Sequence, residues 1–263
     1  KKDFTKKNIN IKLHTNVHSN QYISDLCVGY KIPSGKISIL LGSISFHLKN
    51  EFIKNNSILF LSYYGRNLNR LKSRGIKLVS TIHDMIPEEG SLNNDFIDQK
   101  RKTLFSSTEI VSVSKTSAKK LISFYPSLKG KVSVINNISY LPFTEESYYL
   151  TNALKERKYL LAFSGVAKYK NLDLLIKTFD SSLLPKLGVE LVIIGCGNNF
   201  KIENHIKALL LGINSKINFL IPTDSELKSL YKNSLAVCSL SSNEGFSIPV
   251  IESLHFNKKL IIS

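Results

Sequence analysis

Long apolar runs are absent from this sequence of 263 residues, and cysteine is scarce. The longest apolar runs, 37–46 and 57–64, fall well short of the ~20 residues that a membrane-spanning helix requires, and no signal peptide is expected at the start. The cysteines, Cys27, Cys196 and Cys238, form no CxxC pair, which argues against a zinc ribbon, a thioredoxin-type motif and a disulfide framework. We therefore expect a cytoplasmic protein.

Several motifs for nucleotide or metal binding are also missing. No G-x4-G-K-[ST] sequence is present, so a P-loop is excluded. The Gly-x-Gly at 195–197 lacks the third glycine of a dinucleotide fingerprint, because Phe200 stands at that position. His14 and His18 have the i, i+4 spacing of metal ligands, but they lie in a polar stretch without the glutamate of an H-E-x-x-H motif. We therefore predict no metal site.

Basic residues outnumber acidic ones, and the excess is uneven along the chain. The sequence has 36 Lys and Arg against 20 Asp and Glu, a formal net charge of +16. Residues 1–140 hold 22 of the basic and 9 of the acidic residues, whereas residues 141–263 hold 14 and 11. A one-sided positive field suits a phosphate-rich partner, which could be a nucleic acid, an anionic membrane surface or a phosphorylated lipid. A solvated surface rich in lysine explains any single cluster equally well.

Short runs rich in β-branched residues alternate with helical patterns along the whole chain. This alternation is typical of βα units that build parallel sheets, so the expected fold class is α/β. A polar stretch, 136–157, interrupts the pattern and predicts a connection between two facing Rossmann-like domains, 1–140 and 141–263. Such folds bind ligands outside the carboxyl ends of their strands. The expected strands are 37–41, 58–62, 77–82, 109–113, 131–135, 159–163, 190–194, 216–220, 236–238 and 260–262, and the expected helices are 66–74, 115–124 (capped by Ser114), 171–179, 200–211, 225–233 and 246–255.

Two glutamates, Glu244 and Glu252, stand eight positions apart on either side of a glycine and a proline. On a helix this spacing separates the Cα atoms by ~12 Å, which exceeds the ~5 to 9.5 Å of the carboxyl pair in a glycoside hydrolase. The spacing suits one extended ligand that is touched at two points. Between the glutamates, Gly245 and the amides after it lie at a predicted helix N-terminus, where a diphosphate or sugar hydroxyls would meet donors.

The segment 244–252 resembles the E-x7-E element of retaining family-4 glycosyltransferases, which have the two-domain GT-B fold. The likeness covers about residues 58–263. Because the family's opening strand and closing helix have no counterpart here, we expect a chain cut at both ends. Other pieces resemble the family in the same order: H-D-M-I-P at 83–87, S-V-S-K at 112–115, F-S-G at 163–165 followed by K-N at 170–171, and V-I-I-G-C-G at 192–197.

The resemblance implies roles for three charged residues in binding a nucleoside diphosphate sugar. Glu252 would accept hydrogen bonds from the donor ribose. Glu244 would hold the transferred sugar near its reacting carbon, and its charge would support an oxocarbenium-like centre without a covalent adduct. Lys170 would neutralise the diphosphate.

One departure from the family's pattern affects the second cation at the diphosphate. Family members often have an arginine directly after the glycine equivalent to Gly165, but Val166 stands there in this sequence. Lys168 is the expected substitute. Because a lysine is a point charge and not a bidentate fork, its grip on a phosphate differs from that of an arginine.

The remaining residues implied by the resemblance lie at strand ends and loops. His83 would face the donor from the end of a first-domain strand and donate a hydrogen bond to a sugar hydroxyl or a phosphate. Asp84 fits a helix cap or a loop anchor as well as a ligand contact. Further donor contacts would come from Gly195, Gly245, Phe246 and Ser247.

These expectations combine into a metal-independent hexosyltransferase that needs no cofactor besides its nucleotide-sugar substrate. No Asp-x-Asp pair is present, which is the usual Mg²⁺ ligand set of the other glycosyltransferase architecture. The H-D-M-I-P sequence resembles mannosyl-transferring members, so GDP-mannose is the favoured donor, with UDP- and dTDP-sugars open.

The charge distribution bears on the acceptor and on the alternatives. The basic first half suggests a lipid-linked or anionic saccharide acceptor, as in bacterial polysaccharide or lipopolysaccharide synthesis, at the inner face of the cytoplasmic membrane. The alternative is a nucleotide-sugar-binding or nucleic-acid-binding protein of the same fold without turnover. Nucleic acid is the less expected partner, because the tyrosines are scattered and no known nucleic-acid module is present.

Overall fold

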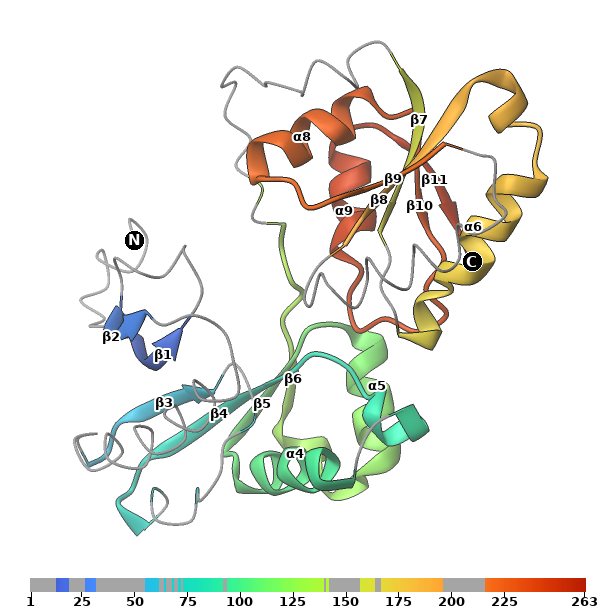
Figure 1. Ribbon diagram of the computed structural model, residues 1–263. Coiled ribbons are helices and arrows are strands. Elements are labelled where there is room, and N and C mark those ends of the chain that lie inside the picture. The colour runs from blue at the N-terminus through green and yellow to red at the C-terminus, as the bar shows by residue number, and fades with distance from the viewer. Residues whose placement is uncertain are drawn as a thin grey trace. The chain divides into compact units, whose positions relative to one another are not determined.

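The computed structural model divides the chain into two compact units, residues 1–60 with 66–78 and residues 61–65 with 79–263. Its strands and α-helices are labelled in Figure 1. The domain boundary predicted at residue 140 falls inside the second unit and stays a prediction. The structure describes residues 13–18, 27–31, 55–61, 64, 68, 71, 73–91, 94–139, 141, 157–163, 167–195 and 216–263.

Two short parallel strands lie near the start of the first unit. Strand β1 (Leu13–His18) pairs with β2 (Cys27–Lys31). Neither strand is predicted from the sequence, because polar residues interrupt both runs and hide a period of two. The strand expected at 37–41 lies outside the described residues.

A four-stranded sheet has the order β3-β4-β5-β6, and β4, β5 and β6 pair in parallel. Its core contains the end of β4, the middle of β5 and the inner faces of two helices. All four strands agree with the expected ones to within one residue at each end. Their bounds are Ile58–Leu61 (β3), Lys77–Ile82 (β4), Glu109–Ser112 (β5) and Val132–Val134 (β6).

One helix beside this sheet is predicted from the sequence and another is not. Helix α5 has the expected bounds, and the Ser114 hydroxyl caps it by accepting the N–H of Ser117 at 3.0 Å. Helix α4 escapes prediction because its buried face includes Lys100 and Thr103, so its apolar residues have no clear helical period. The helices here are η3 (Pro87–Ser91), α4 (Asn94–Ser106), α5 (Lys115–Phe124) and η4 (Pro126–Lys131).

A five-stranded sheet has the order β11-β10-β7-β8-β9, and every neighbouring pair is parallel. Its bounds differ from the expected strands by one residue at most. Together the two larger parallel sheets confirm the predicted α/β class. The strands are Lys158–Phe163 (β7), Val189–Ile194 (β8), Ile217–Leu220 (β9), Ala236–Ser239 (β10) and Lys259–Ile262 (β11).

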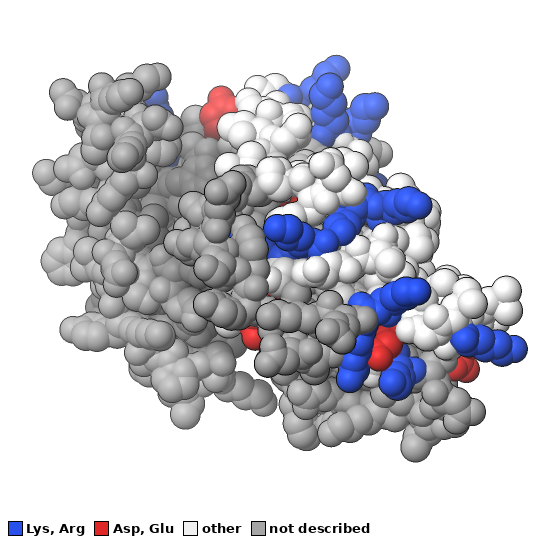
Figure 2. Space-filling view, turned by 90° about the horizontal axis from the view of Figure 1, so that it is seen from above, with Lys and Arg blue, Asp and Glu red and all other residues white. Residues whose placement is uncertain are grey.

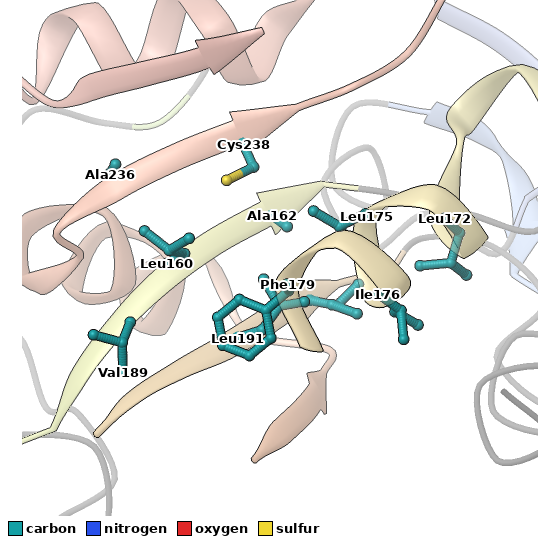
Figure 3. Packing of buried hydrophobic residues seen from close by; sticks show 11 residues of the cluster. Leu160, Ala162, Leu172, Leu175, Ile176, Phe179, Val189, Leu191, Ala236 and Cys238 are labelled. Atoms are coloured by element: carbon teal, nitrogen blue, oxygen red, sulfur yellow. The ribbon is translucent and has the colours of Figure 1, made fainter. Parts of the chain in front are cut away.

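The three central strands of the five-stranded sheet, β10, β7 and β8, are buried on both faces, as expected for a parallel sheet covered by helices. Because successive side chains of a strand point to opposite faces, Leu160 and Ala162 of β7 pack toward α6 (Leu172–Ser181), as Figure 3 shows. Tyr159 and Leu161 of the same strand pack with α8 (Asp224–Asn233) on the other face. Cys238 belongs to the α6 side, and burial raises the pKa of its thiol to about 11.

The remaining described helices of this region are η5 (Lys168–Lys170), η6 (Pro185–Leu187) and α9 (Ile248–His255). Helix α9 begins two residues later than expected, with Ser247 as N-cap and Pro249 in its first turn, the position that proline favours. The helix expected at 200–211 lies outside the described residues. Within the described ranges, every helix is too short or too polar to cross a lipid bilayer.

Candidate functional site

The strand order of the five-stranded sheet places a switch point between β7 and β10. The chain runs from β7 outward through β8 and β9, and then returns to the other side of β7 with β10 and β11. At such a point the loops after the two central strands diverge, and the crevice outside their carboxyl ends is where this kind of sheet binds ligands. Lys170 follows β7 and Glu244 follows β10, so the topology brings both to this edge.

Hydrogen bonds join the loop after β7 to the loop after β10. Asn171 adopts a left-handed backbone with φ of 52°, which turns η5 into α6, and its side-chain amide donates to the carbonyl of Leu240 at 2.7 Å. The amide of Ser242 donates to the carbonyl of Tyr169 at 2.9 Å. These two bonds fix the backbone on both sides of the site.

Lys170 and Glu244 form an ion pair across the two loops. Lys170 Nζ lies 2.5 Å from Glu244 Oε1, and the side chains are 27% and 29% exposed. Lys170 Nζ also lies 5.4 Å from the centre of the Tyr169 ring, within range of a cation–π interaction. The ammonium and the carboxylate are therefore both partly exposed to solvent.

Gly245 touches the backbone at the end of β4. A Cβ atom at position 245 would overlap the carbonyl oxygen of His83 and lie 2.7 Å from its carbonyl carbon, so only glycine fits. The buried Ser117 hydroxyl lies 3.3 Å from the carbonyl of Gly245 and 3.4 Å from that of His83, and donates its one proton to either. The His83 side chain is exposed. The structure thus brings together the backbones of two residues that the sequence analysis assigns separately.

Asn243, next to Glu244, is held by two oppositely charged residues. Its Oδ1 accepts a hydrogen bond from Lys120 Nζ of α5 at 2.9 Å, and its Nδ2 donates to Glu89 Oε2 of η3. Lys120 Nζ also lies 2.7 Å from Glu89 Oε1. The hydrogen bond from Lys120 lowers the pKa of the Glu89 carboxyl by more than burial raises it.

A buried lysine of α4 supports the loop that carries His83 and Asp84. Lys100 Nζ donates to the carbonyl of Asp84 and to Glu88 Oε2, both at 2.7 Å. Neither charged side chain is more than 3% exposed, and burial lowers the pKa of the Lys100 ammonium against the opposing effect of Glu88. The Asp84 carboxylate accepts the amide of Ile86 at 3.0 Å, which makes Asp84 a loop anchor, one of the roles left open by the sequence.

Glu252 lies on α9 with both carboxylate oxygens engaged. Oε1 accepts from the Ser139 hydroxyl at 2.8 Å and Oε2 accepts from the Tyr231 hydroxyl at 2.7 Å. Glu252 is 6% exposed and Tyr231 is fully buried. The Tyr231 ring lies between the rings of Phe163 and Phe256, with centroid distances of 5.3 and 5.2 Å.

The other predicted donor contacts occupy varied positions. Gly195 is buried at the end of β8, and its amide donates to the carbonyl of Leu220 at 3.3 Å. Lys168 is exposed at the start of η5, and Phe246 and Ser247 are half-buried before α9. The predicted contact at 165 lies outside the described residues.

Several residues that surround the predicted ones are not predicted from the sequence. Tyr231 and Ser139 contact Glu252, and Lys120 and Asn243 meet beside Glu244. The nearest of these pairs, Tyr231 and Glu252, is separated by 21 positions in the chain. No local pattern marks such contacts, because they depend on how strands and helices are ordered in the fold.

Comparison with known proteins finds one family whose sequences resemble the second half of the chain. Residues 150–263 match the family described as "Glycosyl transferases group 1". A sequence comparison with curated proteins gives no match.

Solved structures similar to this chain have the GT-B fold. A TarM variant from S. aureus, in complex with Fondaparinux, alpha-GlcNAc-glycerol and UDP, shares 14% identity over 86% of this chain and 45% of its own, with a TM-score of 0.59. An alpha,alpha-trehalose 6-phosphate synthase from Burkholderia multivorans shares 12% identity over 92% of this chain and 64% of its own, with a TM-score of 0.62. HepE from Anabaena, in complex with UDP-glucose, shares 15% identity over 89% of this chain and 58% of its own, with a TM-score of 0.55.

These likenesses and the two parallel-sheet regions confirm the predicted GT-B-like fold. The chain spans about half to two thirds of the length of these structures. Membership of family 4 and the roles of the paired glutamates stay predictions.

Proposed function

We propose that this chain is a retaining glycosyltransferase that moves a sugar from a nucleoside diphosphate to an acceptor hydroxyl. The observation that carries the proposal is the Lys170–Glu244 ion pair at the switch point between β7 and β10, inside the segment that matches glycosyl transferases group 1. A cation and a carboxylate at this edge suit the two parts of such a donor. These are an anionic diphosphate and a sugar that develops positive charge at its reacting carbon.

Donor binding exchanges the partner of Lys170. In the free protein the ammonium is neutralised by Glu244 at 2.5 Å. A diphosphate carries more negative charge than one carboxylate, so it replaces Glu244 beside Lys170. Because both side chains are more than a quarter exposed, water can enter and the exchange carries little desolvation cost. The exchange frees the Glu244 carboxylate for the sugar.

The chemical step breaks the bond between the anomeric carbon and the diphosphate oxygen. Lys170 and the backbone amides at 245–247 stabilise the charge that develops on the leaving diphosphate. The acceptor oxygen forms its new bond on the same face of the sugar, and its proton passes to the leaving phosphate oxygen. Glu244 holds the sugar and stabilises the positive charge on the reacting carbon, without becoming covalently attached.

The donor we favour is GDP-mannose, on the strength of the H-D-M-I-P sequence at 83–87. The UDP and UDP-glucose in the structures of TarM and HepE keep UDP-sugars as the alternative. We propose that neither needs a metal ion, since Lys170 supplies the charge that Mg²⁺ would supply. In a thermal-shift titration with GDP, UDP, ADP and dTDP, one nucleotide at ~100 times its dissociation constant should stabilise the protein by ~2.7 kcal/mol. That shift should be unchanged by EDTA.

The acceptor we propose is a lipid-linked or anionic saccharide at a membrane surface. The net charge is +16, and Lys and Arg outnumber Asp and Glu on the described part of the face in Figure 2. Basic side chains near an anionic leaflet each contribute about 1 kcal/mol of attraction. Sedimentation with liposomes should therefore rise with anionic lipid content and fall with added salt. Sedimentation that responds neither to anionic lipid nor to salt would contradict an acceptor at the membrane surface.

Two substitutions test the roles of the glutamates. We expect Glu244→Ala to lower turnover by ~100-fold or more, while diphosphate affinity stays level or rises, because Lys170 loses its internal partner. Glu252→Ala should mainly weaken donor binding. The measurements are calorimetric titration with the nucleotide and release of sugar from the donor. Equal losses of affinity and turnover in both variants would contradict this division.

A control separates the proposed enzyme from a protein that only binds nucleotide sugars. Lys170→Ala should lower the affinity for a nucleoside diphosphate by ~10-fold or more and leave the affinity for the nucleoside unchanged. Lys177→Ala, on the exposed surface of α6, should change neither affinity. Nucleotide binding that depends on Lys170, with no sugar transfer or release under any condition, would favour the protein without turnover.

A further inference from the structure

Both oxygens of the Glu252 carboxylate already accept hydrogen bonds, and the two donors differ in kind. Tyr231 belongs to α8, in the same sheet region as Glu252. Ser139 lies after β6, 113 positions away from Glu252 in the chain. To bind a ribose hydroxyl, the carboxylate must accept a hydrogen bond from it on one of these two oxygens. The oxygen that can do so is the one whose present donor can be displaced.

The Tyr231 donor is fixed. Its side chain is fully buried and stacked between Phe163 and Phe256 at interplanar angles of 20° and 6°. Burial, together with the negative charge of Glu252, raises the pKa of the Tyr231 hydroxyl, so it remains a donor at any physiological pH. The bond to Oε2 therefore persists whether or not a ligand is present.

The Ser139 donor is replaceable. Its side chain is half-buried, and a serine hydroxyl turns about its single side-chain torsion. The Ser139 hydroxyl also accepts the amide of Leu141 at 3.2 Å, so it keeps one partner when it releases Glu252. A ribose hydroxyl is chemically the same kind of donor, and exchanging one hydroxyl for another leaves the number of hydrogen bonds to the carboxylate unchanged.

We infer that Tyr231 is a positioning residue that presents Glu252 Oε1 to the donor ribose, and that Ser139 occupies this oxygen until a ribose hydroxyl displaces it. The inference rests on the proposed function, in which Glu252 binds the ribose of a nucleoside diphosphate. It adds two residues to the site and assigns them opposite effects. Tyr231 supports nucleotide binding, and Ser139 competes with it.

The opposite effects can be measured with two conservative variants. Tyr231→Phe removes the bond to Oε2, frees the carboxylate to rotate and should weaken nucleoside diphosphate binding about tenfold, which corresponds to ~1.4 kcal/mol. Ser139→Ala removes the competitor and should tighten binding about threefold or more. Both effects should disappear for the 2′,3′-dideoxy form of the same nucleotide, which has no ribose hydroxyl to offer Glu252.

The experiment is isothermal titration of the full chain with UDP, GDP and ADP, followed by the dideoxy form of whichever binds. The control for Tyr231→Phe is Tyr159→Phe, because the Tyr159 side chain is equally buried and its hydroxyl donates at 2.9 Å to the backbone carbonyl of Leu230 rather than to a carboxylate. The control for Ser139→Ala is Ser133→Ala on the exposed side of β6. Neither control should change the ratio of ribo to dideoxy affinity.

The outcomes separate the inference from the function on which it rests. If the wild type binds none of the three diphosphates, the proposed function fails, and the inference fails with it. If the wild type binds one, and Tyr231→Phe lowers the affinities for its ribo and dideoxy forms equally, then the tyrosine has only a structural role and the inference is overturned. Weaker or unchanged ribonucleotide binding in Ser139→Ala overturns it as well, even if Tyr231→Phe does not fold.

Discussion

Replacing Gly245 by alanine should separate two loops of the site. The added Cβ would lie 2.7 Å from the carbonyl carbon of His83 and would overlap its oxygen. Carbon atoms in good contact are ~3.5–4.0 Å apart, so relief of the contact with the carbonyl carbon alone needs a movement of roughly 1 Å, and the overlap with the oxygen needs more. The Ser117 hydroxyl, at 3.3 and 3.4 Å from the two carbonyl oxygens, is already near the limit of hydrogen bonding and would lose its acceptor.

The expected cost combines overpacking with the loss of this hydrogen bond. Overpacking of well-packed sites costs about 1–3 kcal/mol, so we expect Gly245→Ala to lower the free energy of unfolding by ~2 kcal/mol. Because Glu244 precedes the shifted residue, the same movement should reduce turnover ~100-fold, as a displacement of ~1 Å from the reacting geometry does elsewhere.

Urea denaturation and sugar release measure the two effects. The matched control is Gly130→Ala, because a Cβ at position 130 meets nothing within 4 Å. We expect the control to retain the stability and turnover of the wild type. If Gly245→Ala is as stable and as active as Gly130→Ala, the close approach to His83 does not exist in solution and the reasoning fails.

Two further predictions concern charged pairs. Lys100→Met leaves Glu88 buried without its counter-charge and should lower the free energy of unfolding by ~3–5 kcal/mol. Adding Glu88→Leu should restore much of this stability. A double variant that is as unstable in urea as the single one would contradict this prediction. Because the pKa of Glu89 is lowered in the folded protein, its stabilising effect is complete above the unfolded pKa and is lost as the pH falls. The wild type should therefore lose more stability between pH 6 and pH 3 than Glu89→Gln does, as measured by urea titrations at both pH values. If the two proteins lose the same amount of stability, the contact with Lys120 contributes nothing.

Local signals predicted the elements whose pattern is self-contained. The serine before α5 caps it as expected, and the strands of the five-stranded sheet carry enough apolar side chains to mark both buried faces. The expected start of α9, Phe246, is two residues too early because this apolar residue continues the pattern of the helix, whereas Pro249 in the first turn favours the later start. Helix α4 was missed because a lysine occupies its buried face, paired with a glutamate that lies outside the helix.

The candidate site depended on the resemblance, and the structure adds what no linear pattern contains. Lys170 and Glu244 were identified separately, but their ion pair joins residues 74 positions apart. The sequence predicts only that the amides at 245–247 meet the donor, whereas the fold shows from the His83 carbonyl that position 245 requires a glycine. Tyr231 had no signal at all, because a tyrosine in an amphipathic helix is an ordinary core residue until its hydroxyl meets a carboxylate.

The neighbour of Gly245 is a main-chain oxygen, and this limits how the site can change by mutation. A side chain that clashes with a new residue can be replaced by a smaller one, but every amino acid at position 83 has the same carbonyl. No substitution at that position can therefore make room for a larger residue at 245. The Asn243 side chain, in contrast, forms its hydrogen bonds with the side chains of Lys120 and Glu89, so the three can be exchanged together for another compatible set. In a library of combined variants, position 245 should remain glycine while these three positions vary as a group.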